Sequence, residues 1–173
     1  MRLGVLSDSH GQVQRTQAAV DLLLVHGAAQ IVHCGDIGSG QAGVDVLASL
    51  AGAGVKAVFV WGNNDLPGWG RPSDGGVRGL GLEPPESIPL ELAADGWRVL
   101  VCHGHEGVVE RVLRAGEPAE PTLLLSGHTH EAMDQRSGRL WMVNPGALHR
   151  AGQFTCCVVD LLTGKASFLP VPR

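Results

Sequence analysis

The sequence predicts an α/β fold in which short strands alternate with helices. Within the first 65 residues, three short apolar runs alternate with two segments of helical period, and each run ends in Gly, Asp or Asn. Strands alternating with helices indicate βαβ units and a mostly parallel sheet. Open α/β sheets bind ligands at the carboxyl ends of their strands, so these polar clusters are expected to converge. The length of 173 residues predicts one domain, residues 1–173.

The N-terminal part provides the elements of this alternation in order. Strands are predicted for residues 3–6, 31–34 and 55–61. The first helix is predicted for residues 13–24, where an apolar stripe precedes Gly27, and the second for residues 42–50, before Gly52. Residues 66–87 are rich in Gly and Pro without a clear period. They predict a long surface loop, or a short irregular helix that covers a site.

The C-terminal part predicts a second sheet. Residues 88–92 and 97–102 resemble two antiparallel strands joined by a turn at Asp95-Gly96. A short helix over 108–113 and a connector over 117–121 lead to a strand at 123–125. Three further strands are expected to complete this more antiparallel sheet: 140–143, 154–161 and 167–169.

Composition excludes several classes of protein. The formal net charge of −4 gives no basic footprint for duplex nucleic acid, and no apolar run approaches the roughly 20 residues that cross a bilayer. The four cysteines do not form a disulfide pattern, and the first residues read as a buried strand rather than a signal peptide. We therefore expect a cytoplasmic protein with reduced thiols.

Residues with metal-binding side chains follow five of the predicted strands. A single Asp at such a place is usually a helix cap or turn residue, and a single His is usually a surface residue. Together, carboxylate, imidazole and amide oxygen are ligands for divalent Mn, Fe, Zn or Ni. The set is too large for one tetrahedral ion and suits two ions that share a carboxylate. Its members are Asp8, His10, Asp36, Asn63, His103, His128 and His130.

These residues lie in five motifs that occur in a recognisable order: Ser-Asp8-Ser-His10-Gly, Gly-Asp36, Gly-Asn63-Asn64-Asp65, His103-Gly-His105 and Gly-His128-Thr-His130. Together with Val-Asn144-Pro-Gly146, they resemble the calcineurin-like metallophosphoesterases, most closely their small bacterial and archaeal phosphodiesterases of the YfcE type. The resemblance implies a four-layer α/β/β/α sandwich.

The resemblance also implies a ligand set. One ion would be held by Asp8, His10, Asp36 and His130, and the other by Asp36, Asn63, His103 and His128, with Asp36 bridging. A hydroxide between the ions would attack phosphorus, because two cations strongly depress the pKa of bound water. The implied cofactor is two divalent ions per chain, with Mn²⁺ preferred over Ni²⁺, Fe²⁺, Co²⁺ or Zn²⁺.

One position departs from the family pattern. Many members have a His that contacts the phosphate where this chain has Asn64, and this substitution disfavours acid catalysis and monoester turnover. Two interpretations hold for His105: it orients the site or contacts the phosphate, or it is a solvated loop residue. We expect His33 to be a packing residue, His149 to lie on the surface, and Cys34 and Cys102 to be small core residues rather than thiolate ligands.

The predicted function is therefore two-metal hydrolysis of phosphodiester bonds in a small-molecule substrate. The alternatives are a non-catalytic protein-interaction scaffold of the same fold and a phosphomonoesterase. A homo-oligomer is one option, because small members of the family form dimers or larger assemblies.

Overall fold

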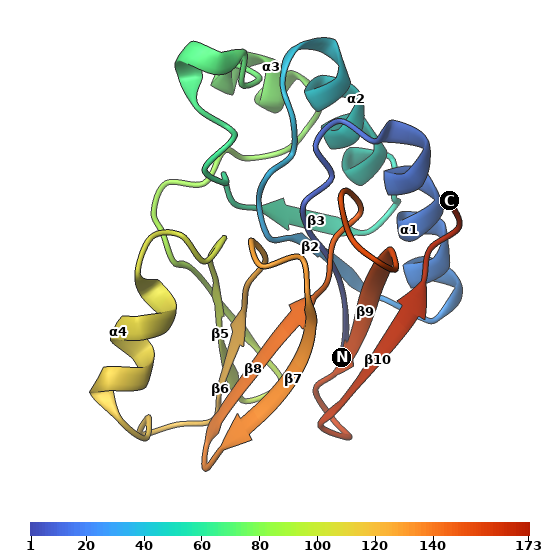
Figure 1. Cartoon of the computed structure of the whole chain (residues 1–173). Coiled ribbons are helices and arrows are strands. Elements are labelled where there is room, and N and C mark those ends of the chain that lie inside the picture. The colour runs from blue at the N-terminus through green and yellow to red at the C-terminus, as the bar shows by residue number, and fades with distance from the viewer.

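The computed structural model describes all residues, 1–173, and contains two five-stranded sheets that face each other (Figure 1). The first sheet has the spatial order β10 (Lys165–Pro170), β9 (Thr155–Asp160), β1 (Arg2–Leu6), β2 (Gln30–His33) and β3 (Lys56–Phe59). The second has the order β4 (Leu90–Ala94), β5 (Trp97–Val101), β6 (Thr122–Leu125), β8 (Leu140–Pro145) and β7 (Ala132–Ser137).

Helices cover the outer faces of both sheets, which gives the predicted four layers. Helices α1 (Val13–Val25) and α2 (Gly40–Ala51) cover the first sheet, and α4 (Val108–Ala115) covers the second (Figure 1). The segment between β3 and β4 contains a short 3₁₀ helix, Pro67–Trp69, and α3 (Asp74–Gly79). The α/β/β/α fold class is thus confirmed. None of the helices is long and apolar enough to cross a membrane.

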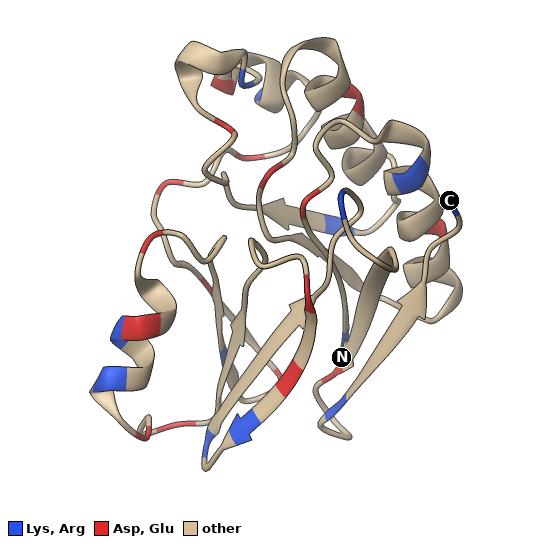
Figure 2. Cartoon of the chain, in the orientation of Figure 1, with Lys and Arg blue, Asp and Glu red and all other residues tan.

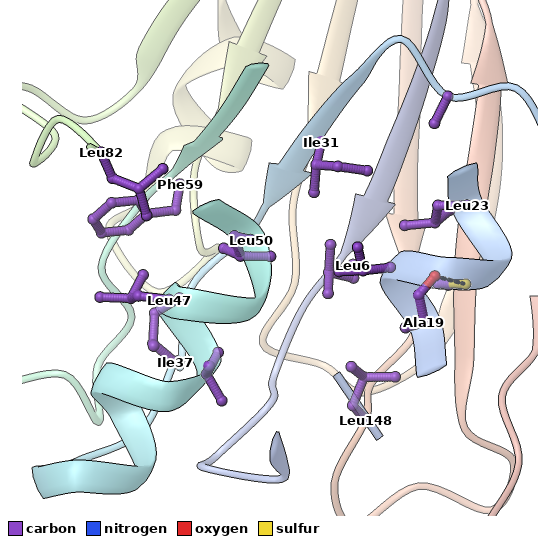
Figure 3. Close-up of a cluster of buried hydrophobic side chains, with 14 of the residues drawn as sticks. Leu6, Ala19, Leu23, Ile31, Ile37, Leu47, Leu50, Phe59, Leu82 and Leu148 are labelled. Carbon is purple, nitrogen blue, oxygen red and sulfur yellow. Dashed lines mark hydrogen bonds between the residues drawn. The ribbon is translucent and has the colours of Figure 1, made fainter. Parts of the chain in front are cut away.

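The alternation of side chains along the strands explains why each sheet is covered on both faces. In β1, Leu3 and Val5 point into the layer between the sheets, whereas Leu6 points towards the helices. Figure 3 shows part of the helix-facing cluster, in which side chains of α1 and α2 lie against those of β1, β2 and β3. At Gly4, a Cβ would lie 3.0 Å from the Cβ of Leu23 in α1 and 2.9 Å from that of Ala28, so the absence of a side chain lets α1 and the loop after it approach closely.

The last two strands join the first sheet, which corrects their expected place in the second. Strand β9 pairs antiparallel with the free edge of β1, with Leu3 opposite Val159, and β10 pairs antiparallel with β9. The Arg2 guanidinium contacts the Asp160 carboxylate at 3.0 Å across this pairing. Residues 155–159 are buried, as in a strand covered on both faces. Burial on both faces is compatible with either sheet, so it does not identify β1 as the partner strand of β9.

The second sheet is also less antiparallel than expected. Strands β5, β6 and β8 run parallel, and only the outer pairs, β4 with β5 and β7 with β8, are antiparallel. Strand β7 was not expected at all, because its side chains are mostly exposed and polar, as an edge strand permits.

The strand order brings loops of both sheets to one end of the molecule. Strands β1, β2 and β3 are parallel, so the loops that follow them leave the same edge of the first sheet. The loops after β5 and β6 lie against the loops of the first sheet. Gly127, for example, follows β6, and a Cβ at this position would lie 2.8 Å from Oδ2 of Asp8 in the loop after β1. Figure 2 shows acidic residues in several of these loops, with Lys and Arg scattered over many elements.

Candidate metal centre

The seven predicted ligands lie on five loops that meet at this end of the molecule. Asp8 and His10 follow β1, Asp36 follows β2, Asn63 follows β3, His103 follows β5, and His128 and His130 follow β6. The backbone here is unusual, because most non-glycine residues with positive φ are predicted ligands. These are Asp8, His10, Asp36, His128 and His130, and the remaining two are Asp95 and Arg150. Such conformations cost energy and concentrate at functional sites.

One group of potential ligands contains Asp8, His10 and His130. One donor atom from each lies within 4.8 Å of the others. Nε2 of His130 is 3.1 Å from Oδ1 of Asp8, and the rings of His10 and His130 are 5.7 Å apart. The three side chains could therefore hold one ion between them.

A second group contains Asp8, Asp36 and His103, again within 4.8 Å of one another. Nε2 of His103 is 3.5 Å from Oδ2 of Asp36, and 3.1 Å from Oδ1 of Asn63. The ring of His128 lies 5.1 Å from that of His103. The structure thus gathers the four residues expected around the second ion.

Both carboxylates lie between the two groups. Oδ2 of Asp36 is 3.3 Å from Nε2 of His10 and 3.5 Å from Nε2 of His103. Oδ1 of Asp8 is close to His130 and 4.0 Å from Nε2 of His103. Asp8 belongs to both compact groups, yet Asp36 has the more even distances to a histidine on each side. We therefore keep Asp36 as the predicted bridging ligand.

The arrangement of polar atoms fits a bound cation. Nδ1 of His103 lies 2.8 Å from the carbonyl oxygen of Cys34 and must donate to it, because that oxygen can only accept. Nε2 of the neutral ring then directs its lone pair at the carboxylates of Asp36 and Asp8. Oδ1 of Asp8 and Nε2 of His10 are buried without a hydrogen-bond partner. Such atoms require an explanation, and a divalent cation supplies one.

The ionisation of Asp36 and His103 points the same way. Burial raises the pKa of Asp36, but hydrogen bonds from His103 and Asn64 outweigh it and hold the pKa well below its usual range. Burial lowers the pKa of His103, but the hydrogen bond and charge of Asp36 raise it above the ordinary value. The raised pKa means that Nε2 of His103 binds a proton more readily than a free imidazole does, at the place that suits a cation.

Two acidic residues hold the ligand loops: Asp65, which belongs to the Gly-Asn63-Asn64-Asp65 motif but was given no role, and Glu106, which belongs to none of the motifs. Buried Asp65 accepts hydrogen bonds from the amides of Ile37, Gly38 and Gly62, at 3.0, 3.0 and 2.8 Å. Glu106 accepts from the amides of His103 and Gly104, at 3.0 and 2.7 Å. Each is a positioning residue. The sequence signal is weak, because an Asp or Glu near a glycine turn is common.

Glycine is required where the loops touch. A Cβ at Gly62 would lie 2.8 Å from Cγ of Asp36, and closer to the Oδ1 and backbone nitrogen of Asp36. A Cβ at Gly35 would lie 2.7 Å from Nδ1 of His103. Any side chain at these positions would displace a predicted ligand.

Asn64 lies beside the predicted ligands and His105 lies near them. The backbone amide of Asn64 donates to Oδ1 of Asp36 at 2.9 Å, and its side-chain Nδ2 donates to Oδ2 at 2.6 Å. Exposed His105 lies 5.4 Å from the ring of His103, and its Nδ1 is 3.6 Å from Oε1 of Glu106. Asn64 thus contacts Asp36 directly, whereas the roles of both residues in catalysis stay predictions.

A cavity of about 470 Å³ opens over the ligands, and none of the residues lining it is hydrophobic. Its walls include His10, Asp36, Asn63, Asn64, His128 and His130, together with His149 and Arg150. His149 was expected on the surface, but it is half-buried, and its ring lies 4.9 Å from that of His10. Partial burial, with the charges of His10 and Arg150, holds the pKa of His149 below its usual range.

The other candidate residues are part of the core. His33 is fully buried, donates from Nε2 to Oγ of Ser9 at 2.8 Å, and accepts from the Gly35 amide on Nδ1 at 3.2 Å. Burial lowers its pKa to about 3. Cys34 and Cys102 are buried free thiols, and burial raises the pKa of Cys102 to about 12. These environments agree with the packing roles predicted for all three.

Comparison with known proteins gives similarity over nearly the whole chain. The model of the Calcineurin-like phosphoesterase superfamily domain matches residues 1–164. Phosphodiesterase MJ0936 from Methanocaldococcus jannaschii is 22% identical over 152 residues, which are 84% of this chain and 83% of that protein.

Two solved structures share the fold. A novel archaeal phosphodiesterase has a TM-score of 0.80 at 18% identity, with 99% of this chain and 100% of the other covered. The phosphoesterase YfcE from E. coli has a TM-score of 0.68 at 22% identity, with the same coverage.

Proposed function

The chain belongs to the calcineurin-like phosphoesterase superfamily, and on that premise we propose that residues 1–173 form one catalytic domain that hydrolyses phosphodiesters with two divalent ions. Its membership makes it a hydrolase of phosphoesters. The observation that most supports two ions is Oδ2 of Asp36, which lies 3.3 and 3.5 Å from histidines on two sides. The proposed ligands are Asp8, His10, Asp36 and His130 for one ion, and Asp36, Asn63, His103 and His128 for the other.

The residues of the chain divide the work around these ions. When bound, the two ions lower the pKa of a coordinated water and offset charge on the phosphoryl oxygens. The Cys34 carbonyl fixes the tautomer of His103, so that Nε2 faces the centre. The amides held by Asp65 keep the loop of Asp36 against the loop of Asn63. The polar cavity then admits the ester, with Asn64 beside the bridging carboxylate.

The direct test is a screen of phosphoesters on metal-stripped protein with Mn²⁺, Ni²⁺, Co²⁺, Zn²⁺ or Mg²⁺ added back. We expect metal-dependent hydrolysis of bis(nitrophenyl) phosphate, with Mn²⁺ among the most effective ions. A non-catalytic scaffold of the same fold would give no turnover with any of these metals, and a phosphomonoesterase would prefer nitrophenyl phosphate.

Metal affinity should fall as the pH is lowered. A proton on Nε2 of His103, whose pKa is raised, must leave before a metal can bind there. Below that pKa, each displaced proton should weaken apparent affinity about tenfold per pH unit. Calorimetric titrations with Mn²⁺ at pH 8, 7 and 6 measure this, and added Mn²⁺ should partly restore activity at the lowest pH. An acid limb that does not respond to metal concentration would contradict the proposed competition.

The leaving group should affect the rate strongly. The Asn64 amide can donate a hydrogen bond but cannot release a proton at neutral pH, and a general acid typically contributes about 10²–10⁴-fold. We expect good turnover of aryl diesters, poor turnover of alkyl esters and monoesters, and a steep dependence of rate on leaving-group pKa. Asn64→His should flatten this dependence and extend activity towards 2′,3′-cyclic nucleotides.

The matched control is Asn64→Gln, which keeps an amide and should keep the steep slope. Because Asn64 also donates to Asp36, metal content is measured for each variant. Equal, shallow slopes for wild type and Asn64→His would show that position 64 only shapes its loop, or that another group such as His105 is the acid.

A further inference from the structure

The segment that follows β8 supplies the one Lys or Arg side chain in the cavity wall. Arg150 is exposed, and its guanidinium has no hydrogen-bond or salt-bridge partner within the chain. Several other arginines do have such partners, as Arg98 has in Glu91 at 2.7 Å. A free guanidinium beside an entirely polar cavity is available to an anionic ligand.

The backbone of this segment is held firmly. Arg150 has a φ of +47°, a left-handed conformation that is rare for a long side chain and persists only where surrounding contacts enforce it. Two residues before it, Leu148 is completely buried, and its amide donates to the Ser7 carbonyl at 3.2 Å. The Arg15 guanidinium donates to the Leu148 carbonyl at 2.5 Å and stacks on Phe154. The segment is thus anchored to the loop of the first ligands.

The same segment contacts two of the proposed metal ligands. Nδ1 of His130 lies 3.4 Å from the carbonyl oxygen of Arg150, and the His149 ring lies 4.9 Å from that of His10. The backbone of Arg150 thereby helps to orient His130, while its side chain belongs to the exposed mouth of the cavity. The backbone from which the Arg150 side chain extends is therefore held close to the centre.

The position of Arg150 determines which part of a substrate it meets. The scissile phosphate belongs at the floor, where buried Asp36 and His103 lie, whereas Arg150 is exposed at the mouth. The wall offers no hydrophobic side chain for an aryl group or a base. We propose, resting on the proposed phosphodiesterase function, that Arg150 binds a second anionic group on the ester arm of the substrate. Its planar guanidinium suits a carboxylate or a terminal phosphate equally.

The test uses two diesters with the same nitrophenyl leaving group and arms of equal size. One arm is 2-carboxyethyl, and the other is its neutral amide, 2-carbamoylethyl. With Mn²⁺-loaded wild type, kcat/KM should be about tenfold higher for the carboxylate, as expected for a charge-assisted pair. Arg150→Met should bring the ratio close to one, and Arg150→Lys should keep part of it. Arg114→Met, an exposed arginine on α4 outside the cavity, is the matched control and should keep the wild-type ratio.

Binding is also measured without turnover, by calorimetry with the methylphosphonate analogues of the same two arms. Wild type should bind the carboxylate about tenfold more tightly than the amide, and Arg150→Met should bind both equally. Equal affinities in wild type would overturn the role of Arg150, even if metal-dependent turnover is found. Absence of metal-dependent turnover with a preserved, Arg150-dependent affinity ratio would instead overturn the proposed function and leave the anion site in place.

Discussion

Replacing Asp36 with Asn is expected to lower the metal content below two ions per chain and to reduce turnover by more than about 100-fold. Losses of 10- to 100-fold are typical even for groups that only orient metal ligands. Oδ2 of Asp36 lies close to one histidine of each proposed ion, so the loss of its charge should weaken both positions. Metal analysis of the purified variant and hydrolysis of bis(nitrophenyl) phosphate measure the two effects.

Two variants make this result interpretable. Asp8→Asn should mainly weaken one position, because Oδ1 of Asp8 is 3.1 Å from His130 but 4.0 Å from His103. Asp21→Asn, on the exposed face of α1, should leave metal content and turnover unchanged. If Asp36→Asn kept full occupancy and wild-type activity, the two-metal assignment would have to be abandoned.

Adding a single methyl group at Gly62 should have a comparable effect without removing any ligand. The new Cβ would lie 2.8 Å from Cγ of Asp36 and closer to other atoms of that residue, so the carboxylate or the loop must move. Overpacking of this kind typically costs about 1–3 kcal/mol of stability. A displacement of about 1 Å at a catalytic group can reduce the rate about 10²-fold. We therefore expect Gly62→Ala to be folded, less stable, and at least about 100-fold less active.

The matched control is Gly75→Ala in α3, where a Cβ would meet nothing within 4 Å. It should match wild-type activity and stability, or be slightly more stable, because Ala favours a helix over Gly. Thermal unfolding of both variants measures the effect on stability, and Mn²⁺ titration measures the effect on metal affinity. Wild-type metal affinity in Gly62→Ala would show that Asp36 does not need its present position.

The regular elements of the first sheet could be predicted because their local patterns are strong. The apolar runs of β1, β2 and β3 are each followed by a polar cluster, and the helices between these strands are followed closely by Gly27 and Gly52. The membership of β9 could not be predicted, since a strand buried on both faces fits either sheet, and only its pairing with β1 decides. Polar β7 has no apolar face to identify it and is stabilised by its neighbour β8.

The candidate site shows the same division between local and long-range information. Asp8, His10, Asp36, Asn63, His103, His128 and His130 could be singled out because each follows a strand, and the structure brings them together. His149 was instead expected on the surface and Arg150 was not considered, because contacts with residues distant in the chain, such as Ser7 and Arg15, hold their segment at the cavity. The roles of Asp65 and Glu106 could not be predicted, because both bind backbone amides, and a backbone amide has no side-chain signal in the sequence.

The most direct measurement is a titration of metal-stripped protein with Mn²⁺, in which bound ions per chain and hydrolysis of bis(nitrophenyl) phosphate are followed together. The proposed two-metal centre predicts saturation at two ions per chain, with turnover appearing as the second ion binds. Saturation at one ion with full turnover, or two bound ions without hydrolysis of any diester, would contradict it.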